Sequence, residues 1–131
     1  MPHLSIEYSS NLQGREKLRA LCEALQRALL ESGLFELGAL RVRAYPCDAY
    51  AIADRHPDNA FADLRLRIGQ GRSVLERQSL GRALMAVAEA HFAVELARPH
   101  FALSLEIVEI DGKFSWKANA IHPRLRGAAK T

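Results

Sequence analysis

Cysteine is scarce in this sequence, with two residues among 131. Cys22 and Cys47 form no Cys-x-x-Cys pair, so a disulfide framework and a thiolate metal site are both excluded, and a reducing compartment is expected. Long apolar runs are also missing, since no stretch reaches the ~20 residues that a membrane-spanning helix needs. The first residues lack the basic and apolar regions of a secretory signal peptide. We therefore expect a cytoplasmic protein that does not enter a membrane.

A large excess of one sign of charge is also missing. Eighteen lysines and arginines face 15 aspartates and glutamates, so the net charge is +3, which is too small to indicate a nucleic acid partner. No serine, histidine and aspartate form a recognisable nucleophilic motif. The histidines also lack the spacing of metal ligands, so we expect no metal site. The five histidines are His3, His56, His91, His100 and His122.

What the sequence does contain is one pattern that occurs twice. Each half has an alternating apolar stretch, then apolar residues at helical spacing, then a second alternating stretch. The expected strands cover 3–8, 40–45, 61–68 and 101–107, and the expected helices include 18–29 and 80–92. This repeat of roughly 60 residues predicts two fused β-α-β units, 2–58 and 59–111, within a single domain of residues 1–131.

Each expected helix is long enough to connect two parallel strands, and such crossovers are right-handed. Both helices then cover one face of a four-stranded sheet, which is an α/β fold of the α+β type. The other face stays polar and is either solvated or covered by other subunits; we favour an oligomer. That face carries Ser5, Glu7, Arg41, Arg43, Asp63, Arg65, Arg67, Ser104 and Glu106. For the segment 112–131, which has too little apolar surface to fold alone, we expect a short hairpin or an arm that reaches a neighbouring subunit.

Proline directly follows the initiator methionine. Proline is tolerated at the first residue of a strand, which is the ordinary explanation. If Met1 is removed, however, Pro2 carries a free amine with a pKa of ~8, closer to neutrality than the ~10 of lysine. The fixed φ angle of proline holds that amine in place, and a base near neutral pH suits general acid–base catalysis. Pro2 is therefore a candidate catalytic residue.

A glycine turn, Gly69-Gln70-Gly71, leads into the second expected helix. Ser73 and Glu76 have the spacing of a capping box, which marks the start of that helix. Helix N-termini attract anions, and Arg72 adds a fork of donors suited to a carboxylate. The pattern is no P-loop, because it lacks the Gly-Lys-Ser/Thr ending. Arg72 either binds an anion or is a solvated arginine of the first turn.

Two further arginines, Arg41 and Arg43, lie on one face of the second expected strand. They either pair with acidic residues such as Glu7 across the sheet or bind an anion. Arginines from separate elements together with an amine favour an anionic organic substrate with two or three carboxylates.

These short motifs together resemble the tautomerase superfamily. The matching stretches are Pro2-His3, Glu7-Tyr8-Ser9 with Asn11, Leu40-Arg41-x-Arg43 and Ile68-Gly69-x-Gly71-Arg72-Ser73. Within the superfamily the chain is most similar to the 5-carboxymethyl-2-hydroxymuconate Δ-isomerase family, a fused double β-α-β chain of about this length. The stretch Trp116-Lys117-x-Asn119-x-Ile121-His122 is similar to the C-terminal signature of that family, so the resemblance runs from residue 2 to about residue 122.

The resemblance implies a fold like that of macrophage migration inhibitory factor and an isomerase that needs no metal or organic cofactor. The family's base, an amino-terminal proline, falls on Pro2, and its carboxylate-binding arginines fall on Arg41 and Arg72. The implied reaction converts 5-carboxymethyl-2-hydroxymuconate, or a similar small anionic 2-hydroxydienoate, into its conjugated keto isomer. The implied setting is a homotrimer in the cytoplasmic degradation of homoprotocatechuate-type aromatic acids. Arg43 also matches the motif but receives no role.

Two alternatives stay open on the same scaffold, because a fold does not fix a reaction. One is hydration, dehalogenation or decarboxylation of an unsaturated acid, which needs an extra carboxylate to activate water; Glu7 and Glu106 are the candidates. The other is a binding module without catalysis. Pro2 can act as a base only if Met1 is removed, since its nitrogen is otherwise an amide.

Overall fold

A computed structural model describes residues 1–12 and 14–129. The first half of the chain forms β1 (His3–Ser9), α1 (Arg15–Glu31), the short helix η1 (Leu37–Ala39) and β2 (Arg41–Cys47). The second half forms β3 (Ala60–Gly69), α2 (Val74–His91), the short helix α3 (Ala93–Leu96) and β4 (Phe101–Ile110). The two predicted β-α-β units are therefore present, in the predicted order.

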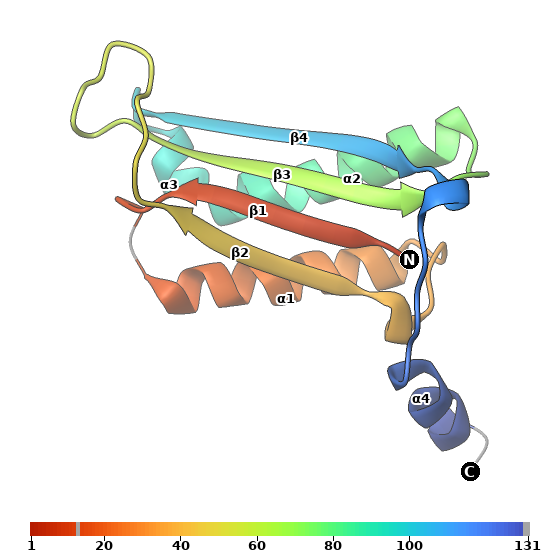
Figure 1. Ribbon diagram of the computed structural model, residues 1–131. Coiled ribbons are helices and arrows are strands. Elements are labelled where there is room, and N and C mark those ends of the chain that lie inside the picture. The colour runs from red at the N-terminus through yellow and green to blue at the C-terminus, as the bar shows by residue number, and fades with distance from the viewer. Residues whose placement is uncertain (13, 130–131) are drawn as a thin grey trace.

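The four strands form one sheet in the order β2-β1-β3-β4. Within each unit the two strands are parallel, as expected of a helical crossover, whereas β1 and β3 run antiparallel where the units meet. Both α1 and α2 lie behind the sheet in Figure 1, on the same face. The predicted four-stranded sheet with two helices on one face is confirmed, and no helix in the described residues is long and apolar enough to cross a membrane.

The core lies between the sheet and the two long helices. Alternate residues of β1 and β3 point into it, and the apolar stripes of α1 and α2 cover them. The residues without any exposed surface include Leu4, Ile6, Leu64 and Leu66 of the strands and Leu21, Leu25 and Leu84 of the helices. The helix α2 begins at the predicted capping box, because the Ser73 hydroxyl accepts from the Glu76 amide and the Glu76 carboxylate accepts from the Ser73 amide.

The opposite face of the sheet is polar, as the alternation of the strands predicts. Its charged side chains partly pair across strands: Arg65 lies 3.3 Å from Glu106, and the Ser104 hydroxyl donates to Asp63 at 2.6 Å. At the end where β1 begins, His3 is flanked by Arg41 of β2 and Arg67 of β3. Three adjacent strands therefore place two arginines and a histidine in one row, next to the amino terminus.

Of the two expectations for the C-terminal segment, a hairpin or an arm that reaches a neighbouring subunit, the hairpin is wrong. Through its described part the segment forms the short helix η2 (Gly112–Phe114), an extended stretch and the helix α4 (Ile121–Ala129), with no strand. In Figure 1 this segment passes the amino terminus and ends beside η1. The reason for a helix is local: Asn119 accepts hydrogen bonds from the amides of Ile121 and His122, and Pro123 lies in the first turn, where proline costs no hydrogen bond. We call residues 112–129 the arm.

Candidate active site

A cavity of about 640 Å³ lies at the end of the sheet where β1 begins and β3 and β4 end. The arm forms one of its walls, and the sheet forms another. Its lining residues are Met1, His3, Arg41, Arg67, Gly69, Gln70, Ile110, Gly112, Ser115, Trp116, Lys117 and Ala118. They include two arginines, one lysine and no carboxylate, so the electrostatics of this cavity favour an anion.

Pro2 is fully buried at the mouth of β1, between Met1 and His3, which both line the cavity. With Met1 in place the nitrogen of Pro2 is a tertiary amide and holds no base. Pro2 itself is not among the lining residues; removal of Met1 would turn its nitrogen into a secondary amine next to the cavity-lining His3. The structure thus places Pro2 directly before β1, as the sequence predicts, and next to a cavity that is lined by Arg41, Arg67 and Lys117.

The environment of the amino terminus lowers the pKa of an amine. Burial is the largest cause of the lowered pKa of the Met1 amino group, followed by Lys117 and then by Arg72 and Arg41. Each of these cations repels the proton of a charged amine. Pro2 lies one residue away from this group, so these cations also lie near the nitrogen of residue 2.

Arg41 is the first residue of β2 and pairs with His3 of β1. It lines the cavity, and its guanidinium contacts the sulfur of Met1. In the described part of the chain Arg41 has no carboxylate within ion-pair distance. Parallel pairing of β1 with β2 therefore brings Arg41 and Pro2 together, and it leaves the guanidinium available to an anion.

Arg72 lies at the turn that leads into α2, as the sequence predicts, and makes contacts that the sequence patterns did not indicate. Its guanidinium donates to the carbonyl of Leu34 at 3.0 Å and to that of Gly69 at 3.3 Å, and it stacks 4.7 Å from the ring centre of Phe35. Arg72 is not among the lining residues of the cavity, although its charge acts on the amino terminus. Its contacts join the turn after β3 to the loop after α1, and they leave the predicted role of Arg72 in binding a carboxylate as a prediction.

We expect an Arg72→Ala variant to unfold with a free energy lower by about 1–3 kcal/mol, because two carbonyls lose a charged donor and Phe35 loses its stacked cation. Thermal or urea denaturation measures this loss. An Arg82→Ala variant, which removes an exposed arginine from α2, provides the matched control. Equal stability of the two variants would contradict the structural role of Arg72.

His3 lies at the centre of the cationic row. Its pKa is lowered mainly by burial and then by the charges of Arg67, Arg43 and Arg41. Arg43 is 3.2 Å from the Nδ1 atom of His3, and since an arginine can only donate, Nδ1 accepts and the other ring nitrogen carries the proton of the neutral ring. Arg43 therefore fixes the orientation of His3, although it does not line the cavity itself.

The sequence patterns missed most of the cavity wall. Arg67 is visible in the alternation of β3 as a residue of the polar face, but nothing local distinguishes it from Arg65. Trp116 and Lys117 occur in a matching motif, yet the motif does not show that the arm folds back over the amino terminus. The two carboxylates considered for water activation lie elsewhere: Glu106 pairs with Arg65, and neither it nor Glu7 lines the cavity.

A second group of titratable side chains lies at the opposite end of the sheet. His56, Asp58 and His100 bring ligand atoms within 4.8 Å of one another, and the two imidazole rings stack at 4.2 Å. The sequence spacing did not indicate this group, because His100 comes from a distant segment. The Nδ1 atom of His56 accepts a hydrogen bond from the Asp58 amide at 3.1 Å, so its other nitrogen carries the proton, and a metal would have to displace that bond.

The sequence matches the 5-carboxymethyl-2-hydroxymuconate isomerase family over residues 2–125. It is 34% identical over 122 residues to the 5-carboxymethyl-2-hydroxymuconate Delta-isomerase of Escherichia coli, a match that covers 93% of this chain and 97% of the relative. The crystal structure of a 5-carboxymethyl-2-hydroxymuconate isomerase from Deinococcus radiodurans R1 is 43% identical, has a TM-score of 0.88, and covers 95% of this chain and 94% of that chain.

More distant proteins share the fold alone. A macrophage migration inhibitory factor-like protein from Entamoeba histolytica is 13% identical with a TM-score of 0.65, over 90% of this chain and 96% of that chain. The predicted tautomerase-like fold is thereby confirmed. Together, the match over nearly the whole length and the shared fold mean that this chain belongs to the 5-carboxymethyl-2-hydroxymuconate isomerase family and is an isomerase.

Proposed function

We propose that the protein converts 5-carboxymethyl-2-hydroxymuconate, or a similar 2-hydroxydienoate, into its conjugated keto isomer, without a cofactor and with Pro2 as the general acid and base. The observation that supports this most directly is the cavity itself. Its wall holds Arg41, Arg67 and Lys117 beside the amino terminus and has no carboxylate among its lining residues. Such a wall attracts a polyanionic substrate and keeps a neighbouring amine neutral, which is the state that a base needs.

The proposed reaction moves one proton within the substrate and leaves its elemental composition unchanged. The proton of the 2-hydroxyl leaves as the carbonyl forms, and a proton is added to a carbon farther along the conjugated chain, so the double bonds shift toward the new carbonyl. Pro2 accepts and returns the proton in this scheme. Arg41 binds a carboxylate and stabilises negative charge that develops on the oxygen. Arg72 adds its positive charge from behind the cavity wall and holds that wall in place.

The alternative chemistries have less support. Two proteins of the same fold are described as a member of a cis-3-chloroacrylic acid dehalogenase family and as a malonate semialdehyde decarboxylase, at 15% and 14% identity. This degree of identity carries the fold and not the reaction. A hydration step needs a carboxylate near the substrate, and Glu7 and Glu106 are not part of the cavity wall.

The test combines two measurements on one preparation. Intact-mass analysis is expected to show loss of Met1, and the processed protein is expected to turn over a 2-hydroxymuconate-type dienol. Proton NMR of the products then distinguishes a conjugated ketone from a hydrated or decarboxylated acid. A processed protein that turns over no dienol would refute the isomerase mechanism, and a product of different mass would favour the alternative chemistry.

We further propose a homotrimer that acts in the cytoplasmic degradation of homoprotocatechuate-type aromatic acids. The open polar face of the sheet, with its cross-strand pairs, offers an extended surface to other subunits. A fused 4-OT protein of the same fold, 10% identical with a TM-score of 0.70, is described as a symmetric trimer. Sedimentation equilibrium checks the assembly, with an expected mass of about three times 14.6 kDa.

A further inference from the structure

The arm contributes a whole wall of the cavity. Four consecutive residues, 115–118, line it, and they face the row formed by His3, Arg41 and Arg67 on the sheet. Lys117 carries the only charge among these four residues. A ligand in the cavity therefore meets positive charge on the sheet and on the arm.

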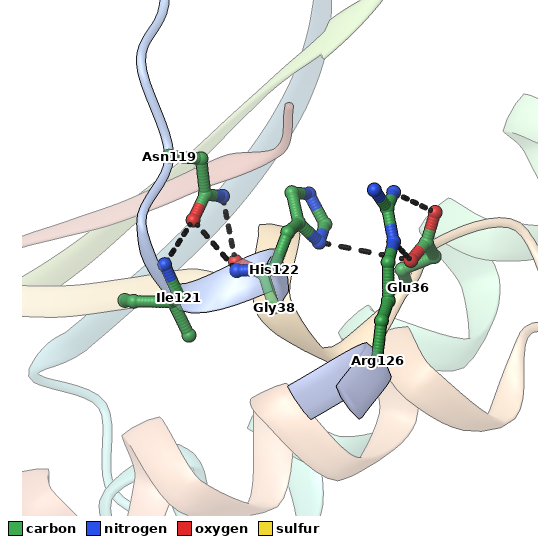
Figure 2. A network of polar contacts seen from close by, with 6 residues as sticks. All are labelled: Glu36, Gly38, Asn119, Ile121, His122 and Arg126. Carbon is green, nitrogen blue, oxygen red and sulfur yellow. Dashed lines mark hydrogen bonds and ion pairs between the residues drawn. The ribbon is translucent and has the colours of Figure 1, made fainter. Parts of the chain in front are cut away.

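Asn119 attaches the arm to η1, the short helix just before Arg41. Its side-chain amide donates to the carbonyl of Gly38 at 3.0 Å. Its carbonyl oxygen accepts from the amides of Ile121 and His122 at 2.8 and 3.1 Å, as Figure 2 shows. One side chain thus caps α4 and ties it to η1, two residues after Lys117.

A second attachment lies one turn further along α4. Arg126 donates two hydrogen bonds to the carboxylate of Glu36, at 2.8 and 2.6 Å, and His122 approaches the same carboxylate at 3.6 Å. The backbone of Gly38 also lies close to His122, since a Cβ atom on Gly38 would lie 2.8 Å from the ring of His122 and 3.3 Å from its Cα atom. The arm is thus held at both ends, by β4 and by η1, and residues 115–118 extend across the cavity between these ends.

We propose that Lys117 is a specificity-determining residue, which binds a second carboxylate of a dicarboxylate ligand whose first carboxylate is bound by Arg41. Asn119, Glu36 and Arg126 are positioning residues, because they hold the arm and are not among the residues that line the cavity. This proposal rests on the proposed function for the identity of the cavity. It adds that the arm selects ligands by their number of carboxylates.

The single tryptophan of the chain allows a direct binding experiment. Trp116 lines the cavity next to Lys117 and is 85% exposed, so a bound ligand changes its surroundings. Muconate and sorbate serve as the probes, because both are six-carbon dienoates and they differ in having two carboxylates and one. Titration of the tryptophan fluorescence gives a Kd for each ligand without any turnover, and calorimetry gives an independent value.

The wild-type protein is expected to bind muconate at least tenfold more tightly than sorbate. In Lys117→Met the affinity for muconate is expected to fall about tenfold, toward that for sorbate, while the affinity for sorbate changes by less than twofold. Lys113→Met, an exposed lysine in the same arm, is the matched control and is expected to behave as wild type. Asn119→Ala and Arg126→Gln, which weaken the attachment of the arm, are expected to reproduce part of the loss of affinity for muconate. Arg124→Gln on the same helix is the matched control for Arg126→Gln.

Three results would overturn the proposal: no preference for muconate in the wild type, an equal loss for both ligands in Lys117→Met, or an unchanged affinity for muconate in that variant. A failure of the proposed function looks different. In that case dienols are not turned over, but the preference for muconate and its dependence on Lys117 persist, because the titration requires no chemistry.

Discussion

Replacing Pro2 by alanine is expected to lower kcat for dienol ketonisation by about two orders of magnitude, within the range that general acid–base catalysis contributes. The loss is not complete, because processing of the variant still leaves a primary amine at residue 2. That amine has lost the fixed φ angle of proline and the packing of a fully buried ring, so it occupies the productive position less often. Steady-state kinetics on mass-verified, processed protein measures the effect.

The wild-type sequence supplies its own control. Protein that keeps Met1, made by inhibiting the methionine aminopeptidase during expression, has the same side chains but an amide at residue 2. Its activity is expected to fall more than that of the alanine variant, since an amide nitrogen cannot accept the proton. Equal rates for the processed and unprocessed wild-type proteins would contradict a role of Pro2 as the base.

The pH profile provides a further check on the same residue. Burial, Lys117, Arg72 and Arg41 lower the pKa of the Met1 amino group below its usual 8.0, and we expect the same groups to lower the pKa of the Pro2 amine after processing. A base works in its deprotonated form, so kcat/KM is expected to rise with pH through a pKa below 8.0 and then to level. Loss of the Lys117 charge is expected to move that limb to higher pH, because one source of repulsion on the protonated amine is removed.

The fold could be predicted from the sequence because its signals are local. Alternation in strands, helical spacing of leucines and the Ser73–Glu76 capping box depend on residues within one or two turns of each other. To predict that Pro2 and Arg41 lie close together, one further inference is needed: β1 pairs with β2 in parallel, as a helical crossover implies. These parts of the candidate site could therefore be reached by reasoning on the sequence.

The arm could not be predicted in the same way, because its contacts are remote in sequence. Asn119 bonds to Gly38 across 81 residues, and Arg126 bonds to Glu36 across 90. Nothing near residue 117 shows that the amino terminus will be its neighbour. Arg72 illustrates a related difficulty: its helix-start position suggests an anion site but does not show that the guanidinium also donates to the carbonyl of Leu34, 38 residues away.

Replacing Arg41 by glutamine is expected to lower kcat/KM by about 100-fold. A charged hydrogen bond to a carboxylate or to a developing oxyanion contributes about 2–3 kcal/mol, and 1.36 kcal/mol corresponds to tenfold. The hydrogen bonds of Arg41 predict little change in stability, since among the described residues its guanidinium donates only to the Met1 sulfur, which processing removes. An Arg27→Gln variant, which loses an exposed arginine of α1, is the matched control for the change in net charge.

The division of the loss between KM and kcat identifies what Arg41 does. A higher KM with an unchanged kcat means that Arg41 binds the substrate carboxylate equally in the ground state and in the transition state. A lower kcat means that it stabilises the charge on the reacting oxygen. An Arg41→Gln variant that keeps the kcat/KM of Arg27→Gln would place the substrate elsewhere. The remaining cations of the wall, Arg67 and Lys117, would then be the first residues to examine, because they line the same cavity and carry the same charge.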